Sequence, residues 1–461
     1  MSLRAAIAAS LPLCLLLTGC PLTDHYRLQE DSLGAQGGRA ALTSSAGAGD
    51  DQSSAGFAEG GEFASNGGSG GEVESETAGR ASGGSSSEAC SVICNAERSC
   101  VAERCTGGWV SMAAPPALLV ARSKAASVAM GKAAFIWGGL DNNGMALGNG
   151  AIYDPASDNW IYLPQDPGSP PPRINATAVW TGSGSNKVIV YGGTDATGGM
   201  VFRDGSVYDV ANNMWTPLPA SMSTSKRSAP FGYWDGTRAV FFGGLTATAA
   251  VVPGADRFDL KTWTTSTTGG DPGLLAFSAV AFDGTVMYLQ GGVIEGVRQD
   301  KVFAYTSSTN TWASLTKGPS ARTGGFGAWD GTHFVVWGGQ DDAGMVADGK
   351  TLSGTSWSDM SSSKVLSARR IGAGRSGWAF QVGPGVVGMI AGQTSTSGSS
   401  DTLATDGATY AVQSGQWTPI PSWPSDEKHE YGVGVWTGEE FVIWGGRTQN
   451  VSTLTGERWA P

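Results

Sequence analysis

Short apolar runs that end in a glycine pair recur along the C-terminal three-quarters of the chain. Each run has three to five apolar residues, the pattern of a buried β-strand bounded by a turn. Six copies end in Gly-Gly and one weaker copy ends in Ala-Gly; they lie at 135–139, 190–193, 241–244, 288–292, 336–339, 389–392 and 443–446. Their spacing of roughly fifty residues is typical of propeller blades.

Two aromatic signals follow the glycine pairs in a constant order. A Tyr-Asp pair or a related residue lies about fifteen residues on, as in Tyr153-Asp154. A tryptophan follows after a short turn; the six are Trp160, Trp215, Trp263, Trp312, Trp357 and Trp417. This order of signals resembles the kelch repeat over residues 109–461. The resemblance implies an all-β fold, a seven-bladed kelch-type β-propeller.

The two ends of the repeat array predict how the ring closes. The last copy stops at Trp459, which matches only the third strand of a blade, while Trp109 reads like an outgoing fourth strand with no blade before it. We predict that this N-terminal strand completes the seventh blade, because closure removes exposed sheet edges. The propeller is expected over residues 107–461.

The N-terminus has the pattern of a lipoprotein signal peptide. Arg4 precedes an apolar run that is too short for a permanent membrane span, so residues 1–19 read as a signal peptide. Leu17-Thr18-Gly19-Cys20 resembles the lipobox of bacterial lipoproteins, which implies lipidation of Cys20. The alternative is an ordinary secretory peptide. Pro21, in place of an aspartate, favours an outer-membrane or cell-surface location in the cell envelope.

The next two segments differ in composition from the repeats. Residues 20–88 are mostly Gly, Ser, Ala and Glu, so we expect a disordered linker between the lipid anchor and the folded domain. A small cysteine-rich segment, 89–106, contains Cys90, Cys94, Cys100 and Cys105. An even cysteine count in an exported segment predicts two disulfides of undetermined pairing. A four-cysteine zinc site is the alternative, although its usual CxxC pairs are missing.

Charge and histidine content exclude several function classes. The formal net charge is −11, whereas nucleic-acid binding needs a basic surface, so no nucleic-acid partner is expected. The chain has three histidines, which leaves little for a histidine metal site or a proton relay. We expect no cofactor, no metal and a monomer.

One repeated position predicts a ligand site. Counting back sixteen residues from each glycine pair, with an allowance for the longer turn at 183–186 in the second blade, reaches a basic or potentially basic residue in six of the seven blades; these are Arg122, Arg173, Arg227, Arg322, Arg375 and His429. Arg369 competes with Arg375 in the sixth blade. A ring of arginines at the channel mouth would favour an acidic glycan or peptide. The alternative is that these arginines are framework residues that bind carbonyl groups between blades.

The resemblance also allows enzyme alternatives to be tested. Galactose oxidase, a kelch relative, needs a cysteine crosslinked to tyrosine beside copper, but the propeller has no cysteine after Cys105. The repeated Ser-x-Asp-x-Gly-x-x-Trp box of sialidases is missing. A non-catalytic surface binding module is therefore favoured; a sialic-acid mutarotase and a purely structural envelope protein are the alternatives.

Overall fold

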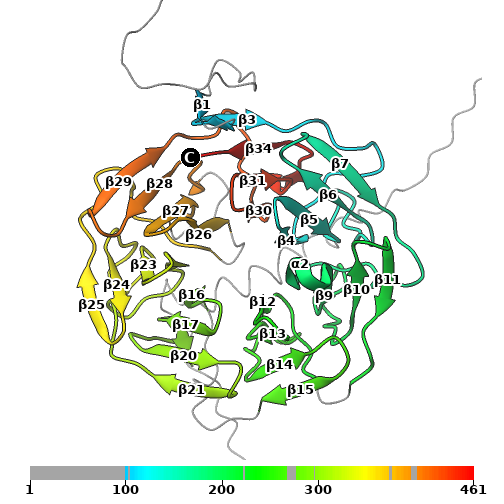
Figure 1. The fold of residues 1–461 in the computed structure, drawn as a ribbon, viewed down its shortest axis with the longest axis horizontal. Helices are drawn as coiled ribbons and strands as arrows, with labels where there is room; N and C mark the ends of the chain where they lie inside the picture. Colours follow the sequence, from blue (N-terminus) through cyan, green and yellow to red (C-terminus); the bar gives the residue numbers. More distant parts are fainter. Residues whose placement is uncertain are drawn as a thin grey trace, which may run out of the picture.

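The structure is a computed structural model that describes residues 99–101, 104–221, 224–266, 277–294, 296–372, 376–395 and 402–461. The signal peptide, Cys20, the linker, Cys90, Cys94 and Arg375 lie outside these residues. Seven four-stranded antiparallel sheets surround a central axis, as Figure 1 shows. This confirms the predicted all-β, seven-bladed propeller.

The first four blades follow one another along the chain. The first blade contains β4 (Ala126–Met130), β5 (Ala133–Trp137), β6 (Gly150–Asp154) and β7 (Asn159–Leu163). The second contains β8 (Thr177–Trp180), β9 (Lys187–Tyr191), β10 (Gly205–Asp209) and β11 (Met214–Pro217). The third contains β12 (Phe231–Trp234), β13 (Ala239–Phe242), β14 (Ala255–Phe258) and β15 (Trp263–Ser266). The fourth contains β16 (Ala279–Phe282), β17 (Val286–Gln290), β20 (Val302–Thr306) and β21 (Thr311–Ser314).

The last three blades complete the ring. The fifth contains β22 (Phe326–Trp329), β23 (Phe334–Trp337), β24 (Gly349–Ser353) and β25 (Ser356–Asp359). The sixth contains β26 (Gly377–Gly383), β27 (Val386–Ala391), β28 (Gly407–Ala411) and β29 (Gln416–Ile420). The seventh contains β30 (Val433–Trp436), β31 (Phe441–Trp444), β34 (Gly456–Trp459) and the N-terminal strand β3 (Trp109–Ser111).

The predicted closure is confirmed by the pairing of β3 with β34. Trp109 lies opposite Trp459, and Ser111 lies opposite Glu457. The Trp109 indole also donates a hydrogen bond to the Pro421 carbonyl at 2.7 Å, which joins the strand to the sixth blade. The strand that precedes the first repeat and the strands of the last repeat therefore share one sheet.

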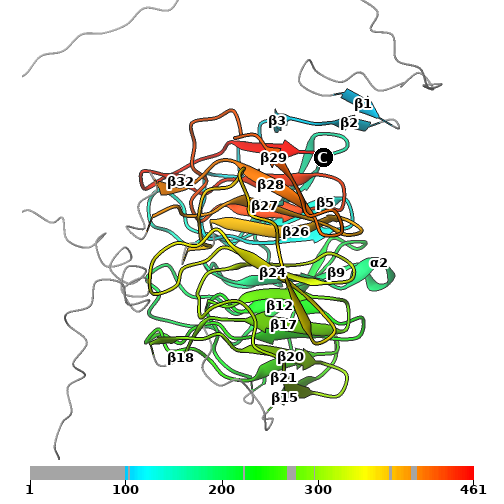
Figure 2. The ribbon, with the colours of Figure 1, turned by 90° about the vertical axis from the view of Figure 1, so that its left-hand side faces the viewer.

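Smaller elements mark the two faces of the ring. The hairpins after the glycine pairs include β18 (Val293–Ile294) with β19 (Val297–Arg298), and β32 (Arg447–Thr448) with β33 (Val451–Ser452). The short helix α2 (Gly182–Ser185) lies on the opposite face, as Figure 2 shows. We call the face of the hairpins the mouth face.

A two-stranded hairpin precedes the propeller. It pairs β1 (Ser99–Val101) with β2 (Arg104–Thr106), and its register places Cys100 opposite Cys105. Among the described helices none is long and apolar enough to cross a bilayer.

The core lies between neighbouring sheets and is rich in aromatic side chains. The tryptophan of each outer strand packs against the blade before it, as with Trp215 and Trp137 at a ring distance of 5.7 Å and Trp160 and Trp444 at 5.4 Å. Large aromatic side chains bury much apolar area and fill the wedge between twisted sheets. The aromatic repeats of the sequence thus stabilise the contacts between blades.

Candidate functional site

The basic residues at the repeated position are buried framework residues. Arg122, Arg173, Arg227, Arg322 and His429 are buried, and Arg369 fills the position in the sixth blade. Each basic group contacts the carbonyl oxygen of the first residue of the glycine pair, at 3.0 Å for Arg122 and Gly138 and at 2.6 Å for His429 and Gly445. These side chains therefore do not form the positive ring that the sequence analysis predicted, and the framework alternative describes them.

The same contact recurs around the ring. The other pairs are Arg173–Gly192, Arg227–Gly243, Arg322–Gly338 and Arg369–Ala391. Burial lowers the pKa of the Arg122 guanidinium to about 10 and also lowers that of Arg173, against the opposing effect of Asp204. Arg122 stays charged at neutral pH. Its guanidinium donates hydrogen bonds to backbone oxygens that would otherwise be buried without partners.

Whereas the His429 carbonyl accepts a hydrogen bond from the Gly432 N–H of its own blade, the backbone of each framework arginine joins its blade to the preceding one. Its carbonyl accepts a hydrogen bond from the second glycine of that blade, as with Arg173 and Gly139 at 2.9 Å and Arg322 and Gly292 at 2.7 Å. The first glycine packs on the same carbonyl: a Cβ at Gly192 would lie 2.5 Å from the Arg227 oxygen. Close approach and positive φ thus favour glycine at both positions of the second blade, whereas Ala391 occupies the first position of the sixth blade with a φ of 63°.

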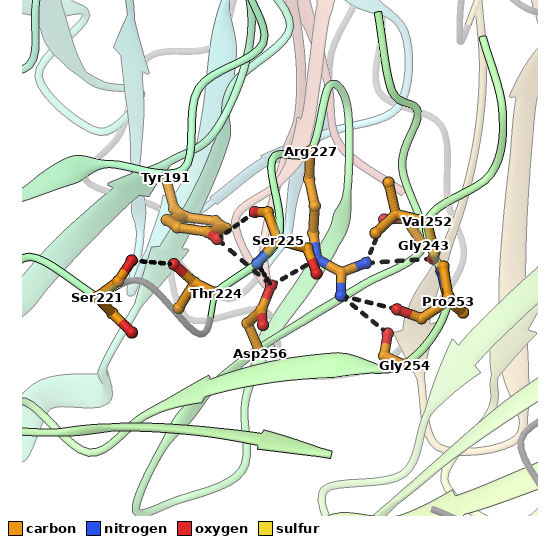
Figure 3. A network of polar contacts seen from close by, with 10 residues as sticks. All are labelled: Tyr191, Ser221, Thr224, Ser225, Arg227, Gly243, Val252, Pro253, Gly254 and Asp256. Atoms are coloured by element: carbon orange, nitrogen blue, oxygen red, sulfur yellow. Dashed lines mark hydrogen bonds and ion pairs between the residues drawn. The ribbon is translucent and has the colours of Figure 1, made fainter. Parts of the chain in front are cut away.

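The basic residues of the third and seventh blades pair with a buried carboxylate, whereas the carboxylate partners of Arg173, Arg322 and Arg369 are exposed. Figure 3 shows Arg227 between Asp256, at 2.7 Å, and the carbonyl groups of the next hairpin. Asp256 also accepts hydrogen bonds from the Tyr191 hydroxyl and the Ser225 N–H, and burial raises the pKa of Tyr191 above its ordinary value. Arg227 and Asp256 are both buried and are hydrogen-bonded to each other and to neighbouring groups, so the network stabilises the contact between the second and third blades.

His429 repeats the network in the seventh blade. Its Nδ1 lies 2.6 Å from the Gly445 carbonyl, and its Nε2 lies 2.8 Å from Glu457. The carbonyl can only accept, so Nδ1 donates to it, and Nε2 faces the Glu457 carboxylate. His429 thus replaces the arginine of the other blades together with an acidic partner.

The fourth and sixth blades depart from the repeat. The fourth has Leu275 at the position, outside the described residues, and there the Ser278 hydroxyl donates to the Gly291 carbonyl at 3.2 Å. In the sixth blade Arg369 lies eight residues before β26, whereas Arg122 lies four residues before β4. The extra residues include Arg375. Because of them, a count of sixteen residues back from Ala391 reaches Arg375 instead of Arg369.

A cavity of about 520 Å³ fills the channel at the mouth face and is lined by residues from all seven blades. Its walls are mostly glycine, alanine and serine, with larger apolar side chains that include Phe231, Phe277 and Trp378. The size falls in the range of small-ligand sites. Among the described lining residues, the titratable side chains are those of Lys124 and Tyr431.

The lining at the mouth is built on a ring of backbone hydrogen bonds. The residue two positions after the framework arginine donates its N–H to the corresponding carbonyl of the preceding blade: Lys124 to Tyr431 at 2.9 Å, Asn175 to Lys124 at 3.0 Å, and Ala229 to Asn175 at 2.8 Å. Each of these residues has a positive φ. Backbone contacts therefore set the width of the mouth, and the side chains at these positions decide its chemistry.

A cationic and aromatic cluster occupies this ring where the seventh blade meets the first. The Lys124 ammonium lies 5.1 Å from the centroid of the Tyr431 ring, and the Arg447 guanidinium lies 4.5 Å from it. Arg447 also pairs with Glu430 at 3.3 Å, and both side chains are largely buried. Contacts of this kind hold the cations and the ring in place.

The sequence analysis did not identify this cluster, because Lys124 and Tyr431 belong to the first and last repeats. A signal was present, however. Both residues lie two positions after the framework residue, where the other described blades have Asn175, Ala229, Phe277, Gly324 and Ile371. Among the described residues, no group of three or more His, Cys, Asp or Glu side chains has the arrangement of a metal site.

Comparisons with known proteins agree with the fold. Residues 124–316 match the family model described as the KLHDC2/KLHL20/DRC7 kelch-repeats domain. A "Kelch domain-containing protein" of Sulfurisphaera tokodaii is 34% identical over 83 residues, which cover 18% of this chain and only 12% of that relative.

Solved structures give a weaker comparison. The structure titled "Structure of YjhT" has 18% sequence identity and a TM-score of 0.47, and the match covers 67% of this chain and 99% of that one. The seven blades, the repeated glycine pairs and the family match show that the chain carries a kelch-repeat β-propeller domain.

Proposed function

We propose that this protein is a surface-exposed, lipid-anchored binding protein that takes an acidic sugar into the mouth of its channel. The observation that carries the proposal is the cavity of about 520 Å³ with the Lys124 side chain and the Tyr431 ring in its wall. The ligand enters from the mouth face and places its carboxylate toward Lys124.

The chemistry of the wall supports this ligand class. Lys124 supplies a point charge in a partly buried site, where a charge interacts more strongly with a carboxylate than it would in bulk water. Phe277, Trp378 and Tyr431 offer apolar and aromatic faces for the C–H groups of a sugar ring. Among the described lining residues the titratable groups are Lys124, which supplies a positive charge, and Tyr431, which supplies an aromatic face. This pair supports binding of a sugar more than a mutarotase reaction.

The orientation of the domain fits a tether at the N-terminus. The chain enters the ring through β3, and Figure 2 shows the β1–β2 hairpin on the side of α2, away from β18 and β32. A lipidated Cys20 followed by the linker 20–88 would therefore be attached on the side of the propeller opposite the mouth face, which leaves the mouth open to solvent.

The experiment is a combined glycan and peptide array with the wild-type protein and the Lys124→Met variant. We expect binding to acidic glycans that weakens with added salt and falls at least about tenfold in Lys124→Met. Lys132→Met is the matched control, because Lys132 is exposed and pairs with Glu439 in the seventh blade, away from the cavity lining.

Three results would overturn the proposal. They are selective binding of acidic peptides with no glycan binding, equal losses in Lys124→Met and Lys132→Met, and binding that does not respond to Lys124→Met.

A further inference from the structure

The β1–β2 hairpin carries two of the four cysteines of the segment 89–106. β1 ends at Val101 and β2 begins at Arg104, so two residues form the loop between them. The register pairs Val101 with Arg104 and, one step further from the loop, Cys100 with Cys105. The backbone therefore places these two cysteines directly opposite each other.

The separation of opposite residues in this hairpin fits a disulfide. The pair that closes a two-residue loop, here Val101 and Arg104, exchanges both backbone hydrogen bonds, so the next pair is of the non-hydrogen-bonded kind. In such a pair the Cα atoms lie about 4.5 Å apart, and the Cα separations of disulfides begin at about 4.4 Å. Opposite residues also share one face of the ribbon. A bond between Cys100 and Cys105 therefore requires no shift of the backbone.

The small size of the hairpin also points to a crosslink. Each of its strands has three residues, and a lone two-stranded hairpin is marginally stable at best in water. Small exported elements that bury little apolar surface are commonly stabilised by disulfides. A bond between β1 and β2, at the pair next to the one that closes the loop, supplies this constraint.

The hairpin lies directly before the strand that closes the ring. β2 ends at Thr106, the N–H of the next residue, Gly107, donates to the Ala460 carbonyl at 3.0 Å, and β3 begins at Trp109. Figure 2 shows the hairpin beside β3. The chain that would carry the tether thus reaches the closing strand of the propeller through this hairpin.

We propose that Cys100 and Cys105 form a disulfide that crosslinks the hairpin between the tether and the propeller. Cys90 and Cys94, which lie outside the described residues, are then left to each other, so one of the three pairings that four cysteines allow is selected. The crosslink spans Arg104, so a cut of the chain after this residue leaves the propeller covalently attached to its tether. The bond needs an oxidising compartment, but it does not depend on the acidic-sugar site.

The bond forms by thiol–disulfide exchange with a disulfide oxidant, such as glutathione disulfide. The thiolate of one cysteine attacks the oxidant, which gives a mixed disulfide and releases one thiol. The thiolate of the other cysteine then attacks the mixed disulfide, so the bond between Cys100 and Cys105 forms and the second thiol leaves. The two cysteines lose two protons and two electrons in total, and the two released thiols carry them.

Trypsin separates the cysteines so that mass spectrometry can read the pairing. The relevant peptides are 81–98 with Cys90 and Cys94, 99–104 with Cys100, and 105–122 with Cys105. The full-length protein is reduced without denaturant, reoxidised with glutathione disulfide, alkylated in denaturant with a chelator, and digested without reductant. We expect 99–104 to be linked to 105–122 alone. Both other pairings link all three peptides, and a zinc site leaves Cys100 and Cys105 alkylated; either result would overturn the proposal.

A matched pair of variants checks the assignment. Cys105→Ser should free the Cys100 thiol, which alkylation of the peptide 99–104 detects. Cys90→Ser is the control and should leave the link between 99–104 and 105–122 intact; loss of that link would contradict the pairing. The same digestion of protein isolated from the cell envelope without reductant tests the location separately. A free Cys100 there, together with a bond that glutathione disulfide forms, would contradict the proposed surface location and leave the pairing in place.

Discussion

The carbonyl oxygen of Arg122 accepts a hydrogen bond from the Gly446 N–H at 2.8 Å, so the first blade is joined to the seventh by the contact that joins other neighbouring blades. The Arg122 side chain meanwhile binds the Gly138 carbonyl of its own blade. One residue thus links two sheets with its backbone and its side chain. Four predictions test this arrangement and the charges around it.

Replacing the first glycine of a pair by alanine should lower the free energy of unfolding by more than the strain of a positive φ alone would. We expect Gly198→Ala, in a hairpin with open space around it, to destabilise the fold by about 1 kcal/mol. Gly192→Ala has a similar φ but meets the Arg227 carbonyl, so it should cost about 2 kcal/mol more. Thermal unfolding of both variants measures the difference, and equal losses would contradict the packing argument.

Removing a framework arginine should affect stability. Arg322→Ala deletes the hydrogen bond to the Gly338 carbonyl and the contact with Asp348, so we expect a loss of about 2–4 kcal/mol. Lys317→Ala, which breaks an exposed pair with Asp300, should cost no more than about 0.5 kcal/mol. Denaturant unfolding compares the two. A stable Arg322→Ala protein that loses ligand binding would restore the binding hypothesis for these arginines.

His429 and Glu457 should be energetically coupled. Each is buried and each satisfies the other, so either single alanine substitution leaves a polar group without its partner. We expect the double variant to be more stable than the sum of the single losses predicts, with a coupling energy on the order of 2 kcal/mol. A double-mutant cycle measures this energy, and additive losses would show that the contact is not formed.

Asp209 should titrate at low pH. The side-chain hydrogen bond from Lys187 is the main cause that lowers its pKa to about 2. This is below the ordinary value of about 3.9, so the stabilising contribution is present above pH 4 and is lost as the pH falls toward 2. We expect Lys187→Met to raise this pKa, as measured by carboxyl ¹³C NMR.

Asp259 provides the control for this titration. It lies after the third strand of the next blade, and its pKa is lowered mainly by the Thr262 N–H, so Lys187→Met should leave it unchanged. An Asp209 pKa that stays at about 2 in the variant would show that Lys187 is not the cause.

The sequence by itself determined the blades and the closure of the ring. The glycine pairs, the aromatic repeats and the unpaired Trp109 strand follow from local chemistry, because strand pattern, positive φ and turn signals are properties of short segments. The position sixteen residues before each pair was found in the same way. Arg369 lies twenty-two residues before Ala391 instead of sixteen, and this six-residue difference was enough to replace Arg369 by Arg375 in that count.

Only the tertiary structure decided where the side chains at these positions point. The side chains of Arg122 and its equivalents point into the contacts between blades and away from the channel. They do so because a buried carbonyl group without a hydrogen-bond donor is energetically costly. The Lys124–Tyr431 cluster exists only once the ring is closed, since its members come from the first and last repeats. The repeats along the chain specify the seven blades and their framework contacts. The charged and aromatic groups at the mouth are brought together only where the first and last repeats become neighbours.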